Sequence, residues 1–246
     1  MYSALLVIIY LAFISLGLPD TLLGSAWPQM HIKLNASLSS AGIITMIISL
    51  GTVVSSLFSD RLNIKLGTGK VTAISVLMTA VALIGFSLSH SFIILCVLAV
   101  PYGLGAGAVD AALNNYVALH YSSKHMSWLH CFWGVGASIG PYIIGTCMAH
   151  DLGWRGGYSV ISVLQFTLTV ALFITLPLWK KVENSENNVS NGNNESTQEE
   201  PQERKAKSFS EVLHIKGVIY ILFAFFCYSA VEQTTTLWCC KLSCIK

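Results

Sequence analysis

Apolar side chains run through this sequence in long blocks that are separated by short polar breaks. Because a hydrocarbon core about 30 Å thick is crossed by roughly 20 residues of helix, blocks of that length predict membrane-spanning helices. Seven such blocks are present, at residues 2–27, 38–59, 71–89, 92–119, 126–149, 156–179 and 217–239. The pattern therefore predicts an all-α, polytopic membrane helix bundle embedded in a lipid bilayer.

Lysine and arginine are distributed unevenly among the connections between these blocks. Ten of them fall in the second-to-third, fourth-to-fifth and sixth-to-seventh connections, whereas the opposite connections hold only Lys33 and Arg155. Two more, Lys241 and Lys246, follow the last block. Because basic residues are retained on the cytoplasmic side, we expect a multi-pass protein of the plasma membrane whose N-terminus and three basic connections are cytoplasmic.

Composition agrees with a membrane protein and excludes several other classes. Of the 246 residues, 54% are hydrophobic and only 11% are charged, which is too apolar for a soluble core alone. The net charge of +2 is too small and too scattered for nucleic acid. The seven cysteines follow no metal-ligand or disulfide spacing, and we find no nucleophile elbow or phosphate loop. The sequence thus predicts neither an enzyme nor a cofactor or metal site.

Residues 180–216 form the one long polar segment of the chain. They contain few apolar side chains to offset the entropy of ordering, so we expect a disordered cytoplasmic linker. The linker separates a six-helix half, residues 1–179, from a seventh helix with its tail, residues 217–246. This is the layout of one repeat of a two-repeat transporter followed by the beginning of the second.

Three acidic residues fall within the apolar blocks: Asp20, Asp110 and Glu232. A carboxylate in hydrocarbon costs several kcal/mol, so each should face the bundle interior or a wet cavity. Removing a carboxyl group from water favours its protonated form, which lets such a group take up and release a proton as its surroundings change. Proton coupling is the functional interpretation, and a hydrogen bond that only fixes helix packing is the structural one.

Helical spacing places Asp110 on a defined face. Gly103, Gly107, Asp110 and Asn114 follow one another at intervals of four, three and four residues, so they share one side of a helix. The acid and the amide could both reach one bound polar molecule, while Asn115 lies about 100° further round. For the glycines, close helix packing is the stronger interpretation.

Pro19 directly precedes Asp20 in the first block. Proline removes a backbone donor and bends a helix, which leaves a carbonyl that needs another partner. A bend beside an acid is what a discontinuous binding helix would show. At 1.5 Å per residue, Asp20 lies roughly 27 Å and Asp110 about 14 Å from the cytoplasmic ends of their helices, so we expect them not to form a directly paired dyad.

Further candidates for substrate binding lie in the fifth and seventh blocks. Trp133 offers an aromatic platform on which a sugar could stack, and His130 offers a titratable ring. Glu232 and its neighbour Gln233 indicate a cavity wall in the seventh helix. Plain packing is the alternative for Trp133, and a satisfied polar residue near the interface is the alternative for His130.

The layout and these residues resemble the major facilitator superfamily and, within it, the fucose permease-like sugar:proton symporters. The resemblance rests on Asp20 in "PDTLL" and on Asp110 in "GAVDAALNN". It implies that both acids serve proton coupling and substrate recognition. The architecture it implies is a pair of six-helix halves that rock about a central site, with a small-molecule substrate and a proton as partners and no cofactor.

The connection after the second block, "SDRLNIKLGTGKV", is similar to the superfamily's gating loop. The resemblance assigns Asp60 and Arg61 to its acidic-basic pair, and Gly67 and Lys70 to its turn, although Ser56 stands where a glycine is usual. In the family, charge contacts of this loop break as the halves rock apart. The loop carries no information about the substrate.

Two alternatives to sugar symport follow from the sequence. "GASIGPYIIG" in the fifth block is similar to a glycine-proline motif of proton-coupled drug antiporters, which favours efflux. A twelve-helix transporter needs on the order of 360 to 400 residues, estimated from span length, and the chain ends in "CCKLSCIK". The alternative expectation is therefore a truncated or frameshifted chain that transports nothing alone, either as a non-functional fragment or as a membrane module that needs a partner half.

Overall fold

The computed structural model describes residues 2–192, 215 and 217–243, and every regular element in that part of the chain is a helix. The helices are α1 (Tyr2–Asp20), α2 (Leu22–Lys33), α3 (Ser40–Leu66), α4 (Thr68–Leu88), α5 (Phe92–His120), α6 (Ser123–Ala149), α7 (Gly153–Gly192) and α9 (Val218–Ser243). Within these described residues, seven stretches are long and apolar enough to cross a membrane, with α1 and α2 together forming the first. The predicted all-α membrane bundle is confirmed.

Several helices extend beyond the apolar blocks that predicted them, among them α3, which runs to Leu66. The first span runs to Lys33 rather than to residue 27, because a helix continues past the bilayer wherever its polar side chains can face water. α7 runs on to Gly192, so residues 180–192 are helical where the sequence predicted a disordered linker. Adding residues to an existing helix costs far less than starting a new one, which explains the extension. Apart from Ile215, the rest of the predicted linker lies outside the described residues.

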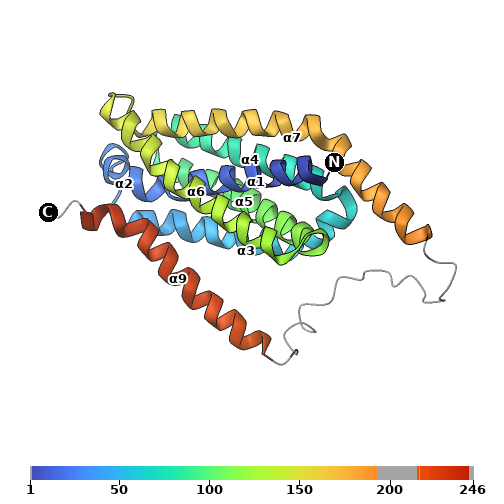
Figure 1. Ribbon diagram of the computed structural model, residues 1–246. Coiled ribbons are helices and arrows are strands. Elements are labelled where there is room, and N and C mark those ends of the chain that lie inside the picture. Colours follow the sequence, from blue (N-terminus) through green and yellow to red (C-terminus); the bar gives the residue numbers. More distant parts are fainter. Residues whose placement is uncertain (1, 193–214, 216, 244–246) are drawn as a thin grey trace. The chain divides into compact units, whose positions relative to one another are not determined.

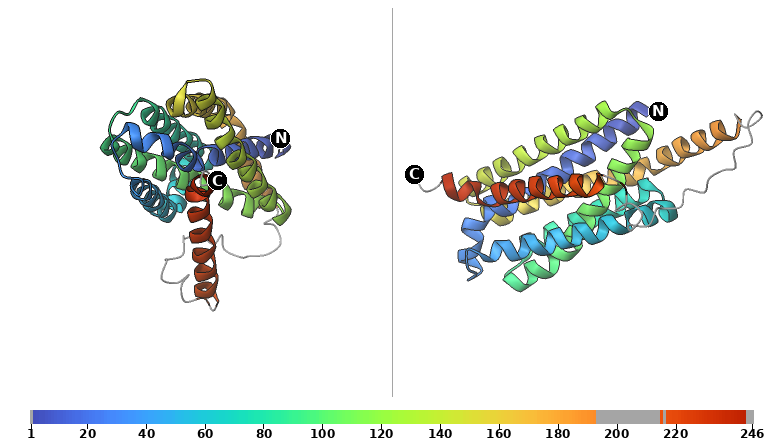
Figure 2. Two further views of the ribbon diagram at one scale, coloured as in Figure 1. Left: turned by 90° about the vertical axis from the view of Figure 1, so that its left-hand side faces the viewer. Right: turned by 90° about the horizontal axis from the view of Figure 1, so that it is seen from below.

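The chain divides into two compact units, Met1–Ser185 and Glu186–Lys246. In the first unit the helices lie side by side: α1 packs along α6, and α3 and α4 both pack along α5 (Figures 1 and 2). The helices of the pairs α1–α6 and α3–α5 are parallel, since residue numbers at successive contacts increase along both helices of each pair. Each candidate acid of this unit therefore lies on a helix with a close parallel neighbour.

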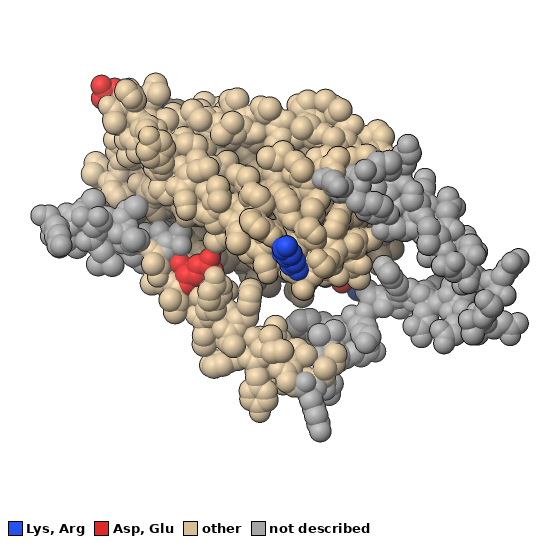
Figure 3. Space-filling view, viewed as in Figure 1, with Lys and Arg blue, Asp and Glu red and all other residues tan. Residues whose placement is uncertain are grey.

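Apolar side chains fill the interior of the first unit and also cover its outside. The buried cluster is centred on α1, where Leu5, Ile9 and Phe13 are at most 1% exposed. On α3, by contrast, Met46 is 73% and Leu50 66% exposed. The face drawn in Figure 3 carries few charged side chains on its described residues. An apolar exterior of this kind is suited to contact with lipid or with other membrane helices.

α1 and α2 are separated by a single turn residue, Thr21, directly after Asp20. Pro19 lies one residue before that acid, within the last turn of α1. The bend predicted from Pro19 is thus present as a break in the helix, and the break places Asp20 at a helix end.

Candidate functional site

Asp20 is held by side chains from two other helices. Its Oδ1 accepts a hydrogen bond from the hydroxyl of Tyr102 on α5, at 3.2 Å. Its Oδ2 accepts one from the indole Nε1–H of Trp133 on α6, at 2.9 Å. Tyr102 is only 4% exposed, so its hydroxyl depends on this carboxyl group as a partner. Three helices therefore meet at one carboxyl group.

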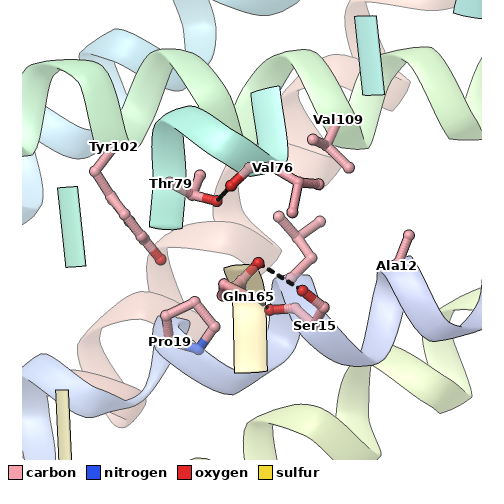
Figure 4. Close-up of a pocket in the computed structure, with 9 residues that line it drawn as sticks. Ala12, Ser15, Pro19, Val76, Thr79, Tyr102, Val109 and Gln165 are labelled. Atoms are coloured by element: carbon pink, nitrogen blue, oxygen red, sulfur yellow. Dashed lines mark hydrogen bonds between the residues drawn. The ribbon is translucent and has the colours of Figure 1, made fainter. Parts of the chain in front are cut away.

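The carbonyl that Pro19 leaves free finds a donor on α7. In an α-helix the amide of residue 19 would donate to the carbonyl of Ser15, four residues earlier, and proline has no such amide. The side-chain amide of Gln165 donates to the Ser15 carbonyl instead, at 2.6 Å. The Ser15 hydroxyl in turn donates to Gln165 Oε1 at 2.7 Å (Figure 4).

A second proline is compensated in the same way at the same level of the bundle. Pro141 in α6 leaves the carbonyl of Ala137 without its helical donor. The hydroxyl of Thr21, in the break between α1 and α2, donates to that carbonyl at 2.9 Å. Side chains thus replace two missing backbone amides, one on α1 and one on α6.

A small cavity adjoins this arrangement, between α1, α4, α5 and α7 (Figure 4). Its volume is about 10 Å³, which is room for no more than one water molecule. Its polar lining comes from Ser15, Thr79, Tyr102 and Gln165. The cavity therefore has a mixed polar and apolar lining, reaches Pro19 and the Asp20 partner Tyr102, and is too small for a sugar.

Asp110 pairs with an amide on its own helix. Asn114 Nδ2 donates to Asp110 Oδ1 at 3.0 Å, and both side chains are partly buried. The other amide atom, Asn114 Oδ1, is buried and accepts no hydrogen bond from the described residues. His130 on α6 lies close enough to interact electrostatically with the Asp110 carboxylate. Asp110 and Asn114 are thus in direct contact, and His130 is an exposed neighbour on α6.

The glycines of α5 serve helix packing. A Cβ atom on Gly103 would collide with the backbone of Ile48, and one on Gly107 with that of Thr52, both on α3. The hydroxyl of Thr52 also donates to the Gly103 carbonyl at 3.3 Å. Packing, the stronger interpretation of these residues from the sequence, is confirmed.

The two acids occupy different levels of the bundle. Tyr102, which binds Asp20, precedes Asp110 by eight residues on α5, which corresponds to about 12 Å along the helix axis. The separation agrees with the depths estimated from chain counting. Asp20 and Asp110 also have different hydrogen-bond partners, as expected for residues that do not form a dyad.

Asn115 lies outside the Asp110 group. Its Nδ2 donates to Asp60 Oδ1, at the far end of α3, over 3.4 Å between two exposed side chains. Its position is the one that a rotation of about 100° from Asn114 predicts. The amide therefore joins α5 to the segment predicted as the gating loop.

The predicted gating loop is a single glycine between two helices. Gly67 separates α3 from α4 and has φ +80°, a conformation that side chains rarely adopt. Gly69 lies against the buried ring of Trp179 from α7, whose Cγ would be 2.7 Å from an added Cβ. Arg61 and Lys70 are both exposed.

Glu232 and Gln233 lie in α9, which belongs to the second compact unit. Glu232 is partly buried and Gln233 is exposed. Their assignment to substrate binding stays a prediction.

Sequence reasoning missed four residues of the site: Tyr102, Ser15, Gln165 and Thr21. Gln165 gave a usable signal, because an amide in an apolar span must find a partner inside the bundle. The carbonyl freed by Pro19 gave the complementary signal. Which donor meets which carbonyl depends on the packing of the helices, which spacing along one helix does not determine.

A family model described as Major Facilitator Superfamily matches residues 9–242 of the chain. The chain is also similar to the uncharacterized transporter y4wD of Sinorhizobium fredii, with 27% identity over 151 residues, or 60% of this chain and 36% of the relative. It is 25% identical over 157 residues to synaptic vesicle glycoprotein 2B of Rattus norvegicus, or 62% of this chain and 22% of the relative.

A putative transporter of Caenorhabditis elegans, B0361.11, is 25% identical over 196 residues, or 72% of this chain and 33% of the relative. The matched part of the chain thus spans between about a fifth and about a third of the length of these curated relatives.

Proposed function

Because the chain belongs to the major facilitator superfamily, we propose that it takes part in proton-coupled symport of a small polar solute, a sugar or a related polyol, across a membrane. The superfamily works as two six-helix halves, and the proposal includes a second half that completes the pathway. The family, and the seven membrane-length helices among the described residues, support the transport part of the proposal.

The observation that carries the proposal is the presence of two acids on membrane-spanning helices, each with polar partners. Asp20 accepts bonds from Tyr102 and Trp133, and Asp110 accepts one from Asn114. A carboxylate without partners is costly within a bilayer. The carboxylates that do occur there have polar partners and most often serve ion or substrate pathways. We assign proton coupling to Asp20 and Asp110.

The Asp110 group has the chemistry of a site for a hydroxylated solute. Asn114 Oδ1 is an acceptor without a donor among the described residues, and the Asp110 carboxylate accepts as well. A solute that carries several hydroxyl groups supplies the donors that such acceptors need. His130 is the polar neighbour on α6, whereas the indole N–H of Trp133 is already bound to Asp20.

The test uses liposomes that contain this chain together with a second six-helix half, and a panel of labelled sugars. We expect accumulation that depends on an inward proton gradient and is lost in Asp20→Asn and in Asp110→Asn. Asp151→Asn is the matched control, since Asp151 is an exposed turn residue with φ +61°, a conformation that asparagine tolerates well. Gradient-independent uptake in the wild type would contradict proton coupling.

Efflux of an amphipathic compound is the second candidate, and the glycine-proline motif in α6 favours it. Gly136 and Gly140 of that motif lie against the backbone of α1 near Leu18, which accounts for both glycines by packing alone. Extrusion of a fluorescent dye from the same liposomes, with no sugar accumulation, is the result that would replace symport by antiport.

We further propose that the protein resides in the plasma membrane with its N-terminus in the cytoplasm, as the ten basic residues of alternate connections indicate. Lys33 and Lys70 are exposed at connections on opposite sides. In intact cells, an impermeant maleimide should label Lys33→Cys and spare Lys70→Cys in a background without other reactive cysteines. The reverse labelling would invert the orientation.

A further inference from the structure

We infer that Gln165 is a positioning residue of the Asp20 site, which acts by supplying the backbone donor that Pro19 removes from α1. Thr21 does the same for α6, where Pro141 removes the donor. The two side chains thereby fix the broken helix from two sides. The relevance of these side chains to transport rests on the function proposed for Asp20, whereas their hydrogen bonds are independent of that function.

The contact between Gln165 and Ser15 is reciprocal and buried. Gln165 is 2% exposed and Ser15 is 7% exposed. The amide donates to the Ser15 carbonyl at 2.6 Å, and the Ser15 hydroxyl donates to the amide oxygen at 2.7 Å. Because both side chains are buried in the bundle, losing either partner would leave buried polar groups without their hydrogen bond.

The identity of the carbonyl is what makes this contact more than a polar pair. Of all the carbonyls on α1, Gln165 binds the one that lies four residues before Pro19. The same holds on α6, where Thr21 binds the carbonyl that lies four residues before Pro141. A side chain at each of these places completes the hydrogen bonding of a helix other than its own.

The position of Asp20 follows from these bonds. Asp20 comes directly after Pro19 and directly before Thr21. The Ser15 carbonyl that Gln165 binds lies five residues before Asp20, and the hydroxyl of Thr21 binds α6 immediately after it. Its own carboxyl group is bound by Tyr102 and Trp133. We conclude that the α1 break is held at three points, on α5, α6 and α7.

A suppression experiment separates this role from ordinary packing. Gln165→Leu removes the donor and keeps a similar volume, and Pro19→Ala restores a backbone amide that can bond the Ser15 carbonyl. We expect Gln165→Leu to lower the apparent Tm in detergent by roughly 5 °C, because it leaves buried polar groups unpaired. Adding Pro19→Ala should recover more than half of that loss.

Pro141→Ala is the matched control, since it restores an amide on the other helix. Pro141→Ala should restore the stability of Thr21→Val but not that of Gln165→Leu. Conversely, Pro19→Ala should not restore the stability of Thr21→Val. A spectroscopic readout accompanies the Tm: the ¹⁹F resonance of 5-fluorotryptophan at Trp133, assigned by its loss in Trp133→Phe. Gln165→Leu should shift or broaden this resonance, and Pro19→Ala should return it toward the wild-type position.

The inference is supported if Pro19→Ala rescues only Gln165→Leu and Pro141→Ala rescues only Thr21→Val. Equal rescue by both proline substitutions, or rescue by neither, would overturn the inference. If Gln165→Leu does not accumulate in the membrane, the amount of protein in the membrane becomes the readout. Pro19→Ala should then restore that amount, and Pro141→Ala should not. None of these measurements uses a transported solute, so the outcome is independent of whether the proposed symport is correct.

Discussion

The two acids of the first unit are supported in different ways. Asp110 takes its partner, Asn114, from one turn further along the same helix. Asp20 accepts hydrogen bonds from Tyr102 and Trp133, which lie on other helices. A partner on the same helix persists when helices move relative to one another, whereas partners on other helices are made or broken by such movement. Asp20 is therefore the acid whose environment reports on helix arrangement.

The two regions also differ in the acceptors they leave open. Both oxygens of Asp20 already accept a hydrogen bond. Next to Asp110, the buried Asn114 Oδ1 has no donor among the described residues. The Asp20 region thus has the character of a structural junction, and the Asp110 region that of a binding site.

The largest effect should come from breaking the helix contact that supports the Asp20 region. Gly136→Val places side-chain atoms into the backbone of α1, where an added Cβ would lie 3.0 Å from the Leu18 amide nitrogen and closer still to the Ile14 carbonyl. Because such overpacking costs about 1–3 kcal/mol or more, we expect a marked loss of folded protein and of apparent Tm.

Gly134→Val is the control for this prediction. Gly134 lies two residues earlier on α6, and no heavy atom is within 4 Å of an added Cβ there. The variant should stay within about 0.5 kcal/mol of the wild type, as surface substitutions usually do. Equal destabilisation by both variants, measured by thermal unfolding in detergent, would show that close packing against α1 is not the cause.

The helices of the bundle could be predicted from the sequence, because each span is an apolar block of the length that a bilayer requires. The positions of the helix ends could not be predicted, since α2 continues to Lys33 and α7 to Gly192 through polar residues. Such extensions depend on helix propagation outside the bilayer, about which the apolar pattern is silent.

The same division holds for the site. The pair Asp110–Asn114 follows from a spacing of four residues on one helix, and the break near Pro19 follows from the chemistry of proline. The bonds of Asp20 to Tyr102 and Trp133 join residues 82 and 113 positions apart. They depend on which helices are neighbours and how far each is rotated, and a single sequence without its packing fixes neither.

Removing each acid in turn should sharpen the contrast between them. Asp20→Ala leaves the buried Tyr102 hydroxyl and the Trp133 indole N–H without their acceptor, while Asp110→Ala leaves one amide group of Asn114. Since a buried donor left unpaired costs about 1–3 kcal/mol, and Tyr102 is buried whereas the Trp133 bond is exposed and Asn114 is only partly buried, Asp20→Ala should be the more destabilising by roughly 1 kcal/mol. Thermal unfolding at one pH compares them, and the opposite order would contradict the role of Asp20 as a junction.

Tyr102→Phe tests one bond of that junction by itself. The change removes the hydroxyl that donates to Asp20 Oδ1 at 3.2 Å and keeps the ring. A single hydrogen bond contributes about 0.5–1.5 kcal/mol, so we expect a small loss of stability together with a shifted ¹⁹F resonance at Trp133. Tyr142→Phe, at a side chain that is 73% exposed, should change neither quantity, and a similar effect there would remove the specificity.

The smallest effect should come from the neighbouring asparagines of α5, which differ in what they bind. Asn115→Ala loses an exposed contact of 3.4 Å to Asp60, and exposed changes of this kind stay within about 0.5 kcal/mol. Asn114→Ala loses the 3.0 Å bond to Asp110 and should cost about 1 kcal/mol. In the transport assay, Asn114→Ala should also weaken solute binding by raising the apparent KM, whereas Asn115→Ala should leave KM unchanged. If the KM changes were reversed, the solute site would lie at the α3–α5 end beside Asp60 and not beside Asp110.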